Sequence, residues 1–137
     1  LNGDQTEITA NANSLVQLKK PVKVGQLTLK VKGSANMVVS EVNADKVDLT
    51  IDGDGSISVK KGTANEGNYN IITKGDIHAF GLEAQKINCK MTGAGLAEVT
   101  PKKNLKAQVI GKGNIRYKGP TAVDQRIIGK GKIEEVF

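Results

Sequence analysis

The chain of 137 residues is long enough for one folded domain, which we expect to span residues 1–137, and too short for two separate cores. Aromatic residues make up only 3% of it, so the core must be built from aliphatic side chains. No apolar run is long enough to cross a membrane as a helix, and the single cysteine excludes an internal disulfide. The net charge of +6 is concentrated in residues 101–137, which hold nine basic and three acidic side chains; residues 1–100 hold eleven of each.

The first regular segment covers residues 7–18. Its apolar residues alternate with polar ones at Ile8, Ala10, Ala12, Val16 and Leu18. A period of two is typical of strands with one buried face. The segment therefore predicts a first coil of strand structure, although it lacks the glycines that mark the rest of the chain. Because Leu1 is an unusual natural start, we expect the chain to be a processed or trimmed form.

From about Leu27 onward, one unit recurs along the chain. It carries two glycine positions separated by one residue, and the second position is occupied by Ala35, Gly55, Gly75, Gly95, Gly113 and Gly131. These residues are 20, 20, 20, 18 and 18 positions apart. The first position is occupied by Gly33, Gly53, Thr73, Gly93, Gly111 and Gly129. The chain is therefore an array of repeats.

Apolar residues recur at fixed distances from these glycines. Four residues before the second position stand Val31, Ile51, Ile71, Met91, Val109 and Ile127, and two residues after it stand Met37, Ile57, Ile77, Ala97, Ile115 and Ile133. Stacked in register at about 4.8 Å per coil, such units form a β-solenoid filled by columns of like residues. We predict an all-β, single-stranded, right-handed parallel β-helix of six to seven coils, each of about 18–20 residues. The handedness follows from the usual crossover rule.

The paired glycines have a structural interpretation in such a coil. A sharp bend within an alternating strand needs residues that accept a positive φ or a close approach of backbones. We interpret each pair as one corner of the coil. A nucleotide-binding loop does not explain glycines that recur in five of the six units.

The end of the chain carries the most specific motif. The pattern G-x-G-x-[IV]-x-Y-x-G-x-P, followed by a short strand and G-x-G-x-[IV], covers Gly111 to Ile133. It resembles the bacterial family of putative auto-transporter adhesins (head GIN domain), whose members are mostly exported or lipid-anchored and common in Bacteroidetes. The resemblance implies a β-helix outside the cytoplasm, in the periplasm, at the outer membrane or on the cell surface. It brings no catalytic residues, and Ala35 and Thr73 depart from its glycine pattern.

One outward column has an enzyme-like composition. Three residues after the second glycine position, successive coils place Ser58, His78 and Glu98 about 5 Å apart, and Arg116 follows. This spacing suits a Ser–His–carboxylate relay. It also suits an ordinary exposed column of polar residues, which is the interpretation we favour, because nothing nearby indicates an oxyanion hole or a substrate cleft.

The sequence predicts no metal site and no cofactor. One histidine and one cysteine cannot form a typical zinc site, and Asp52 and Asp54 are not followed by the further acidic ligands of a calcium loop. Cys89 falls in an apolar column and is expected to be a buried core residue. The outward Asn68, Asn70 and Asn88 are expected to stack as an amide ladder.

The basic end is the main candidate binding surface. Lys74, Lys112 and Lys130 share a column interrupted by Ala94, and the same surface includes Arg116, Lys118 and Lys132. Such a surface suits an anionic polysaccharide, anionic lipid headgroups or an acidic partner protein. The alternative is a charged surface that maintains solubility and discourages edge pairing. We do not expect nucleic acid as a partner, because no set of stacking aromatic residues accompanies the charge.

These observations favour a non-catalytic cell-envelope module that presents a rigid polar surface for adhesion or binding. The first alternative is a structural solenoid that associates with its own kind through the ends of the coil stack. Phe137 folded across the last coil would instead indicate a capped monomer. The second alternative is a polysaccharide-acting enzyme, which would need a cleft with converging charged residues, and the coils have no long loop insertions to build one.

Overall fold

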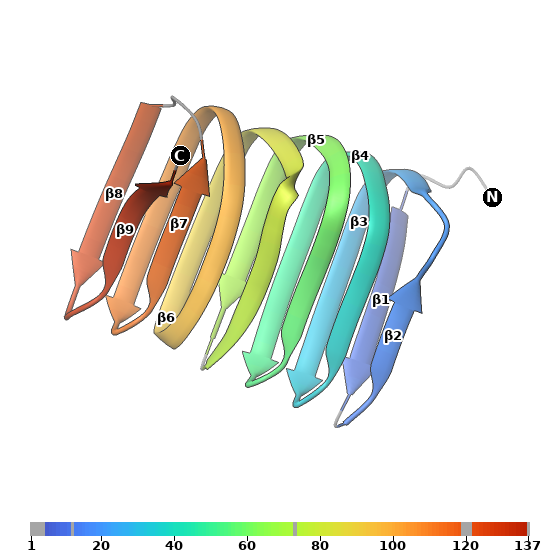
Figure 1. The fold of residues 1–137 in the computed structure, drawn as a ribbon, viewed down its shortest axis with the longest axis horizontal. Helices are drawn as coiled ribbons and strands as arrows, with labels where there is room; N and C mark the ends of the chain where they lie inside the picture. Colours follow the sequence, from blue (N-terminus) through green and yellow to red (C-terminus); the bar gives the residue numbers. More distant parts are fainter. Residues whose placement is uncertain (1–4, 12, 73, 119–121, 137) are drawn as a thin grey trace.

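The computed structural model is an all-β solenoid of about six turns, and it confirms the predicted fold class (Figure 1). It describes residues 5–11, 13–72, 74–118 and 122–136. The strands are β1 (Gln5–Asn11), β2 (Leu15–Leu18), β3 (Val22–Gly33), β4 (Asn36–Gly53), β5 (Ser56–Ile71), β6 (Lys74–Gly111), β7 (Asn114–Lys118), β8 (Ala122–Ile128) and β9 (Lys132–Val136). These described ranges contain no helix that is long and apolar enough to span a membrane.

Every strand pairs with the equivalent strand of the next coil in parallel. The order is β1-β3-β4-β5-β6-β7-β9, with β2 on β4 and β8 on β6. The register follows the sequence repeat. Steps of 20 residues pair Val31 with Ile51 and Ile51 with Ile71, and a step of 18 residues pairs Ala97 with Ile115. Each coil therefore places equivalent residues in one column. The long strand β6 supplies two successive levels of the stack (Figure 1).

The two glycines of each corner have different functions. The first glycine has a positive φ in the five coils where it is described, and at Gly53 φ is 128°. An L-residue rarely adopts this conformation. The second glycine faces inward, and a Cβ added to Gly55 would overlap the Ala35 carbonyl and the side chain of Val31. The first glycine therefore turns the chain, and both positions allow the coils to approach, because a Cβ added to Gly53 would also overlap the Gly33 backbone. Thr73, at the first position, lies outside the described residues.

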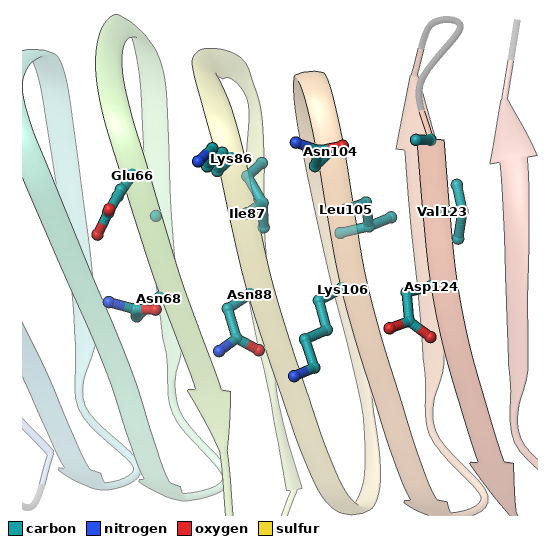
Figure 2. A pocket seen from close by; sticks show the side chains of 12 residues that line it. Glu66, Asn68, Lys86, Ile87, Asn88, Asn104, Leu105, Lys106, Val123 and Asp124 are labelled. Atoms are coloured by element: carbon teal, nitrogen blue, oxygen red, sulfur yellow. The ribbon is translucent and has the colours of Figure 1, made fainter.

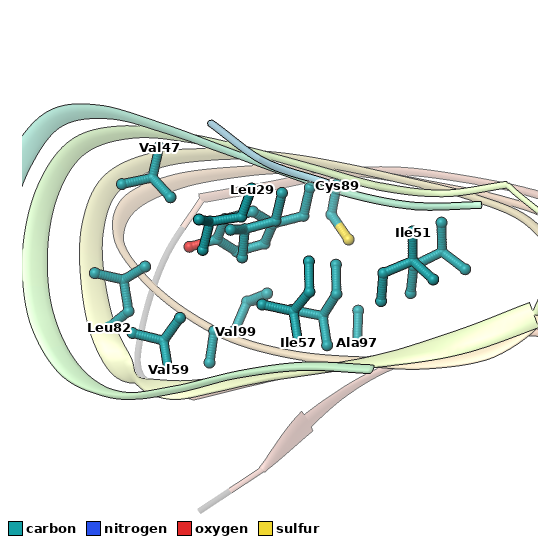
Figure 3. Packing of buried hydrophobic residues seen from close by; sticks show 14 of the residues in the cluster. Leu29, Val47, Ile51, Ile57, Val59, Leu82, Cys89, Ala97 and Val99 are labelled. Carbon is teal, nitrogen blue, oxygen red and sulfur yellow. The ribbon is translucent and has the colours of Figure 1, made fainter. Parts of the chain in front are cut away.

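Mostly aliphatic side chains form one continuous core between two layers of strands (Figure 3). Ile57, Ile77 and Ile115 are all 0% exposed, as the repeat predicts. Tyr69, at 1%, is the only aromatic residue in the buried core of the described part. The interior is apolar, and in the described part of the chain no charged or polar residue is buried.

The two ends of the stack differ. The predicted first coil is present, with Ala10 of β1 paired to Val31 and Val16 of β2 paired to Met37; Ala12 lies outside the described residues.

At the other end, the prediction that Ile127 is buried like Val109 is wrong, because its side chain is 38% exposed. In this last coil two inward positions carry polar residues, Gln125 and Glu135. Among the described strands, β8 and β9 have a neighbour on one side only. Phe137, the predicted cap, lies outside the described residues.

Candidate functional site

A shallow groove crosses the outer face of the solenoid over β5, β6 and β8 (Figure 2). Its volume is about 460 Å³. The polar residues that line it are Glu66, Asn68, Lys86, Asn88, Asn104, Lys106 and Asp124. None of its described lining residues is aromatic. The rest of the lining is apolar or glycine, so the polar side chains stand beside apolar surface: Gly67, Ile87, Leu105, Ala122 and Val123.

The repeat places these side chains in a regular grid. Glu66 is in register with Lys86, and Lys106 with Asp124, so each of two neighbouring outward columns contains one pair of opposite charges. Asparagine side chains lie between them, and each amide offers both donors and an acceptor. Such a grid can bind a ligand that carries many hydroxyl groups, because donors and acceptors recur at a fixed spacing of about 4.8 Å.

The predicted amide ladder is realised only in part. Asn68 and Asn88 are in register, but Asn68 Nδ2 donates to Asp48 Oδ1 at 2.9 Å. Asn70 lies in register with Lys90. In this column the hydrogen bond therefore joins an asparagine amide to an aspartate carboxylate, instead of joining two amides. Sequence reasoning noted these asparagines as structural and missed the groove.

The six basic residues of the predicted anionic-ligand surface fall into two groups. Lys74, Lys112, Lys130 and Lys132 are exposed at or beside the glycine corner. Arg116 and Lys118 lie on the strand β7 and have partners of their own. Arg116 Nη1 is 3.8 Å from Glu98 Oε2, and Lys118 Nζ is 4.6 Å from the ring centroid of Phe80. The uncompensated positive charge is therefore at the corner.

The column of Ser58, His78 and Glu98 forms as the spacing predicts. Ser58 is in register with His78, and His78 Nδ1 donates to Glu98 Oε1 at 2.7 Å. Within the described residues, however, no hydrogen bond joins Ser58 to His78, and none of the three lines the groove. The His78–Glu98 pair continues into Arg116, whose Nε is buried without a partner in that same part of the chain. The Ser–His–carboxylate relay is thus incomplete, and its residues lie on the outer face of the strands, outside the groove.

Cys89 and Asp54 occupy structural positions. Cys89 is a free, buried thiol, as predicted, and burial raises its pKa to about 12. Asp54 accepts a hydrogen bond of 2.7 Å from Ser34 Oγ in the neighbouring coil. Over the described ranges, no three His, Cys, Asp or Glu side chains are grouped as metal ligands.

A parallel β-solenoid with an aliphatic interior and polar outer columns defines the class of protein. Over residues 4–120 the chain matches the family described as putative auto-transporter adhesin, head GIN domain. It belongs to that family, as its closing motif indicated.

Solved structures of related chains have the same fold. A putative adhesin from Parabacteroides distasonis is 66% identical with a TM-score of 0.96, and one from Parabacteroides merdae is 56% identical with a TM-score of 0.98. A putative lipid binding protein from Parabacteroides distasonis is 30% identical with a TM-score of 0.95. Each alignment covers 98% of this chain but only 56%, 56% and 54% of the respective relative, so the chain spans about half their length. No curated protein matches it.

Proposed function

We propose that the chain is a non-catalytic binding module that acts in adhesion at the cell envelope, as an exported, lipoprotein-like component of a Bacteroidetes cell. The observation that carries this proposal is the groove over β5, β6 and β8, with its amide and charged side chains (Figure 2). A groove held by a stacked backbone is preorganised, so a ligand does not have to order it on binding. The family name and the relatives named as adhesins agree with this function.

The groove favours a glycan as the ligand. Asn68, Asn88 and Asn104 supply amide donors and acceptors for hydroxyl groups, and Lys86 and Lys106 add charge-assisted donors. The two acidic residues, Glu66 and Asp124, make the formal charge of the groove zero, which does not favour a strongly anionic polymer. We therefore assign a neutral or zwitterionic polysaccharide to the groove.

The corner lysines form a separate candidate surface for an anionic ligand. They are Lys74, Lys112, Lys130 and Lys132, with Arg116 and Lys118 at its margin. One relative is named for lipid binding, which is consistent with anionic headgroups as a ligand class.

The geometry of the His78 column supports a function without catalysis. A serine nucleophile must transfer its proton to a histidine within hydrogen-bond reach. His78 bonds to Glu98 on one side, but its pairing with Ser58 is a register relationship without a hydrogen bond in the described part. The column also lies apart from the groove that we assign to the glycan.

Self-association through the coil ends is the second candidate. The free side of β8 and the 38% exposure of Ile127 favour the addition of another coil. The exposed Gln125 and Glu135 at inward positions oppose it, since stacking would bury them. Sedimentation velocity over a range of concentrations distinguishes the two: a constant coefficient excludes polymerisation, and a rising one supports it.

A glycan array tests the groove. Wild type is compared with Asn88→Ala/Lys106→Ala, and with the matched control Asn114→Ala/Lys60→Ala, which removes the same side-chain types outside the groove. We expect the groove variant to lose at least about tenfold in affinity for the glycans that wild type binds, and the control to retain it. Equal loss in both variants, or no glycan bound by wild type, would exclude the groove as a glycan site.

A further inference from the structure

Exposed isoleucines are concentrated at the glycine corner. Within the described part of the chain, the large hydrophobic side chains that are exposed are Leu15, Ile72, Ile127 and Ile128. Three of these four are isoleucines next to the corner. Ile72 is 42% and Ile128 is 48% exposed. Ile128 is in register with the half-buried Ile110, so the apolar surface continues into the neighbouring coil.

A lysine lies between the two glycine positions of the corner, next to three isoleucines. Ile72, Ile110 and Ile128 are followed two positions later by Lys74, Lys112 and Lys130, and Lys132 adds a further cation. None of these four lysines makes an ion pair within the described residues. We call the set Ile110, Lys112, Ile128, Lys130 and Lys132 the apolar–cationic edge.

The residues at the glycine corner change in polarity and charge along the stack. In the last three coils the outward corner residues are Thr92, Ala94, Leu96, Ile110, Lys112, Asn114, Ile128, Lys130 and Lys132, with three lysines and no acidic residue. In the coil that contains Gly55, the same positions hold Asp52, Asp54 and Ser56. Asp54 and Asp76 are the carboxylates nearest in the repeat to Lys74, which lies at the boundary. Only the C-terminal part of the corner therefore combines apolar side chains with uncompensated positive charge.

We infer that the apolar–cationic edge docks onto an anionic lipid surface. Isoleucines beside lysines match the boundary between acyl chains and headgroups, where apolar groups are buried and ammonium groups meet phosphate. Coils stacked about 4.8 Å apart hold these residues in a straight row, so several can touch a flat bilayer together. A soluble polyanion would bind the lysines and leave the isoleucines in water, which does not explain their exposure.

This inference rests on the proposed anionic-ligand surface of the corner lysines and narrows its ligand to a lipid bilayer. The groove residue Lys106 is four positions from Ile110 along the strand, or about 13 Å. The groove can therefore bind a glycan while the edge contacts lipid, and either proposal can fail without the other.

Vesicle co-sedimentation at low salt tests the edge. Vesicles of phosphatidylcholine alone are compared with vesicles in which about one third of the lipid is phosphatidylglycerol. The variants are Lys112→Glu/Lys130→Glu and Ile128→Ser, and the control Lys60→Glu/Lys103→Glu has the same change of net charge on exposed lysines away from the glycine corner. The replaced isoleucine is exposed, so folding is expected to persist and is checked by circular dichroism.

We expect wild type to bind the anionic vesicles and not the zwitterionic ones. Charge reversal at the edge should weaken binding at least roughly twentyfold, at about fivefold for each lysine, and the control should change it much less. The isoleucine variant should lose binding to vesicles but retain binding to soluble dextran sulfate. The inference is overturned if the control weakens binding as much as the edge variant, if zwitterionic vesicles bind equally, or if the isoleucine variant binds vesicles like wild type.

Discussion

The ring of Tyr69 occupies the interior space in front of Gly67. A Cβ added to Gly67 would lie 3.0 Å from three atoms of that side chain. Gly67 stands in the inward column of Val47, and Tyr69 stands in the column of Leu49. In this coil one inward position has lost its side chain and the next has a larger one, while the register with the neighbouring coils is unbroken. The Tyr69 hydroxyl has no hydrogen-bond partner among the described residues, so the exchange also leaves a polar atom unsatisfied.

The exchange predicts strong coupling between the two positions. Gly67→Val should destabilise by about 1–3 kcal/mol through overpacking, and Tyr69→Leu by a similar amount through a cavity. The double variant restores the pair found at Val47 and Leu49, so it should be more stable than the sum of the single effects by at least about 1 kcal/mol. Urea unfolding followed by circular dichroism measures all three. Additive effects would show that Tyr69 does not fill the space of Gly67.

The coil could be predicted from the sequence because the repeat is most regular at the buried positions, where packing tolerates the least change. Columns such as Ile57, Ile77 and Ile115 must point inward together, since a shift of one residue would expose all of them. The burial of Ile127 was predicted wrongly for a physical reason. A column position is buried only if the next coil covers it, and the pattern within a coil does not contain that information.

The two glycines of one corner should respond differently to a second substitution. At Gly111 φ is 118° and an added Cβ would also overlap the Gly93 carbonyl, so Gly111→Ala should cost at least roughly 1–2 kcal/mol through the backbone, whatever side chains surround it. At Gly113 an added Cβ would overlap Met91 Sδ, so Gly113→Ala is destabilising mainly through a side chain.

Shortening that side chain with Met91→Ala should therefore rescue Gly113→Ala and leave the cost of Gly111→Ala unchanged. Thermal unfolding of the two double variants, each compared with Met91→Ala alone, measures the difference. Equal rescue of both glycine variants would contradict the division of functions within the corner.

The buried thiol of Cys89 predicts a loss of stability at high pH. Burial raises its pKa from 9.0 to about 12. The folded protein then retains a proton that the unfolded chain releases, so the stabilisation is complete below pH 9 and is lost as pH rises towards 12. The slope contributed by this one group is about 1.4 kcal/mol for each pH unit. Cys89→Ala should unfold with a shallower dependence on pH between about 9 and 10. Above that range the buried Tyr69, whose pKa burial also raises, should maintain a slope in both proteins. Urea unfolding at a series of pH values checks this, and identical slopes for wild type and variant would contradict it.

The candidate sites were less predictable than the fold. The repeat correctly placed His78 beside Glu98, because column neighbours are fixed by the period. It grouped Arg116 with the corner lysines because formal charge takes no account of the nearby Glu98 carboxylate. The groove was missed because its hollow depends on the curvature of the sheet and on side-chain size across several coils. No single unit of the sequence contains that shape.

The carboxylate of Glu98 should limit how strongly the C-terminal coils attract a polyanion. Glu98 is paired with both His78 and Arg116, so Glu98→Gln releases positive charge beside the corner lysines. We expect this variant to elute from a heparin column at higher salt than wild type, because screening competes with the added attraction. Glu83→Gln is the matched control, since it changes net charge equally and breaks an ion pair of 3.0 Å with Lys102. A shift for Glu98→Gln that exceeds the shift for Glu83→Gln would locate the polyanion on the C-terminal coils. Equal shifts would mean that retention depends on net charge alone, and the basic surface would then have no special role.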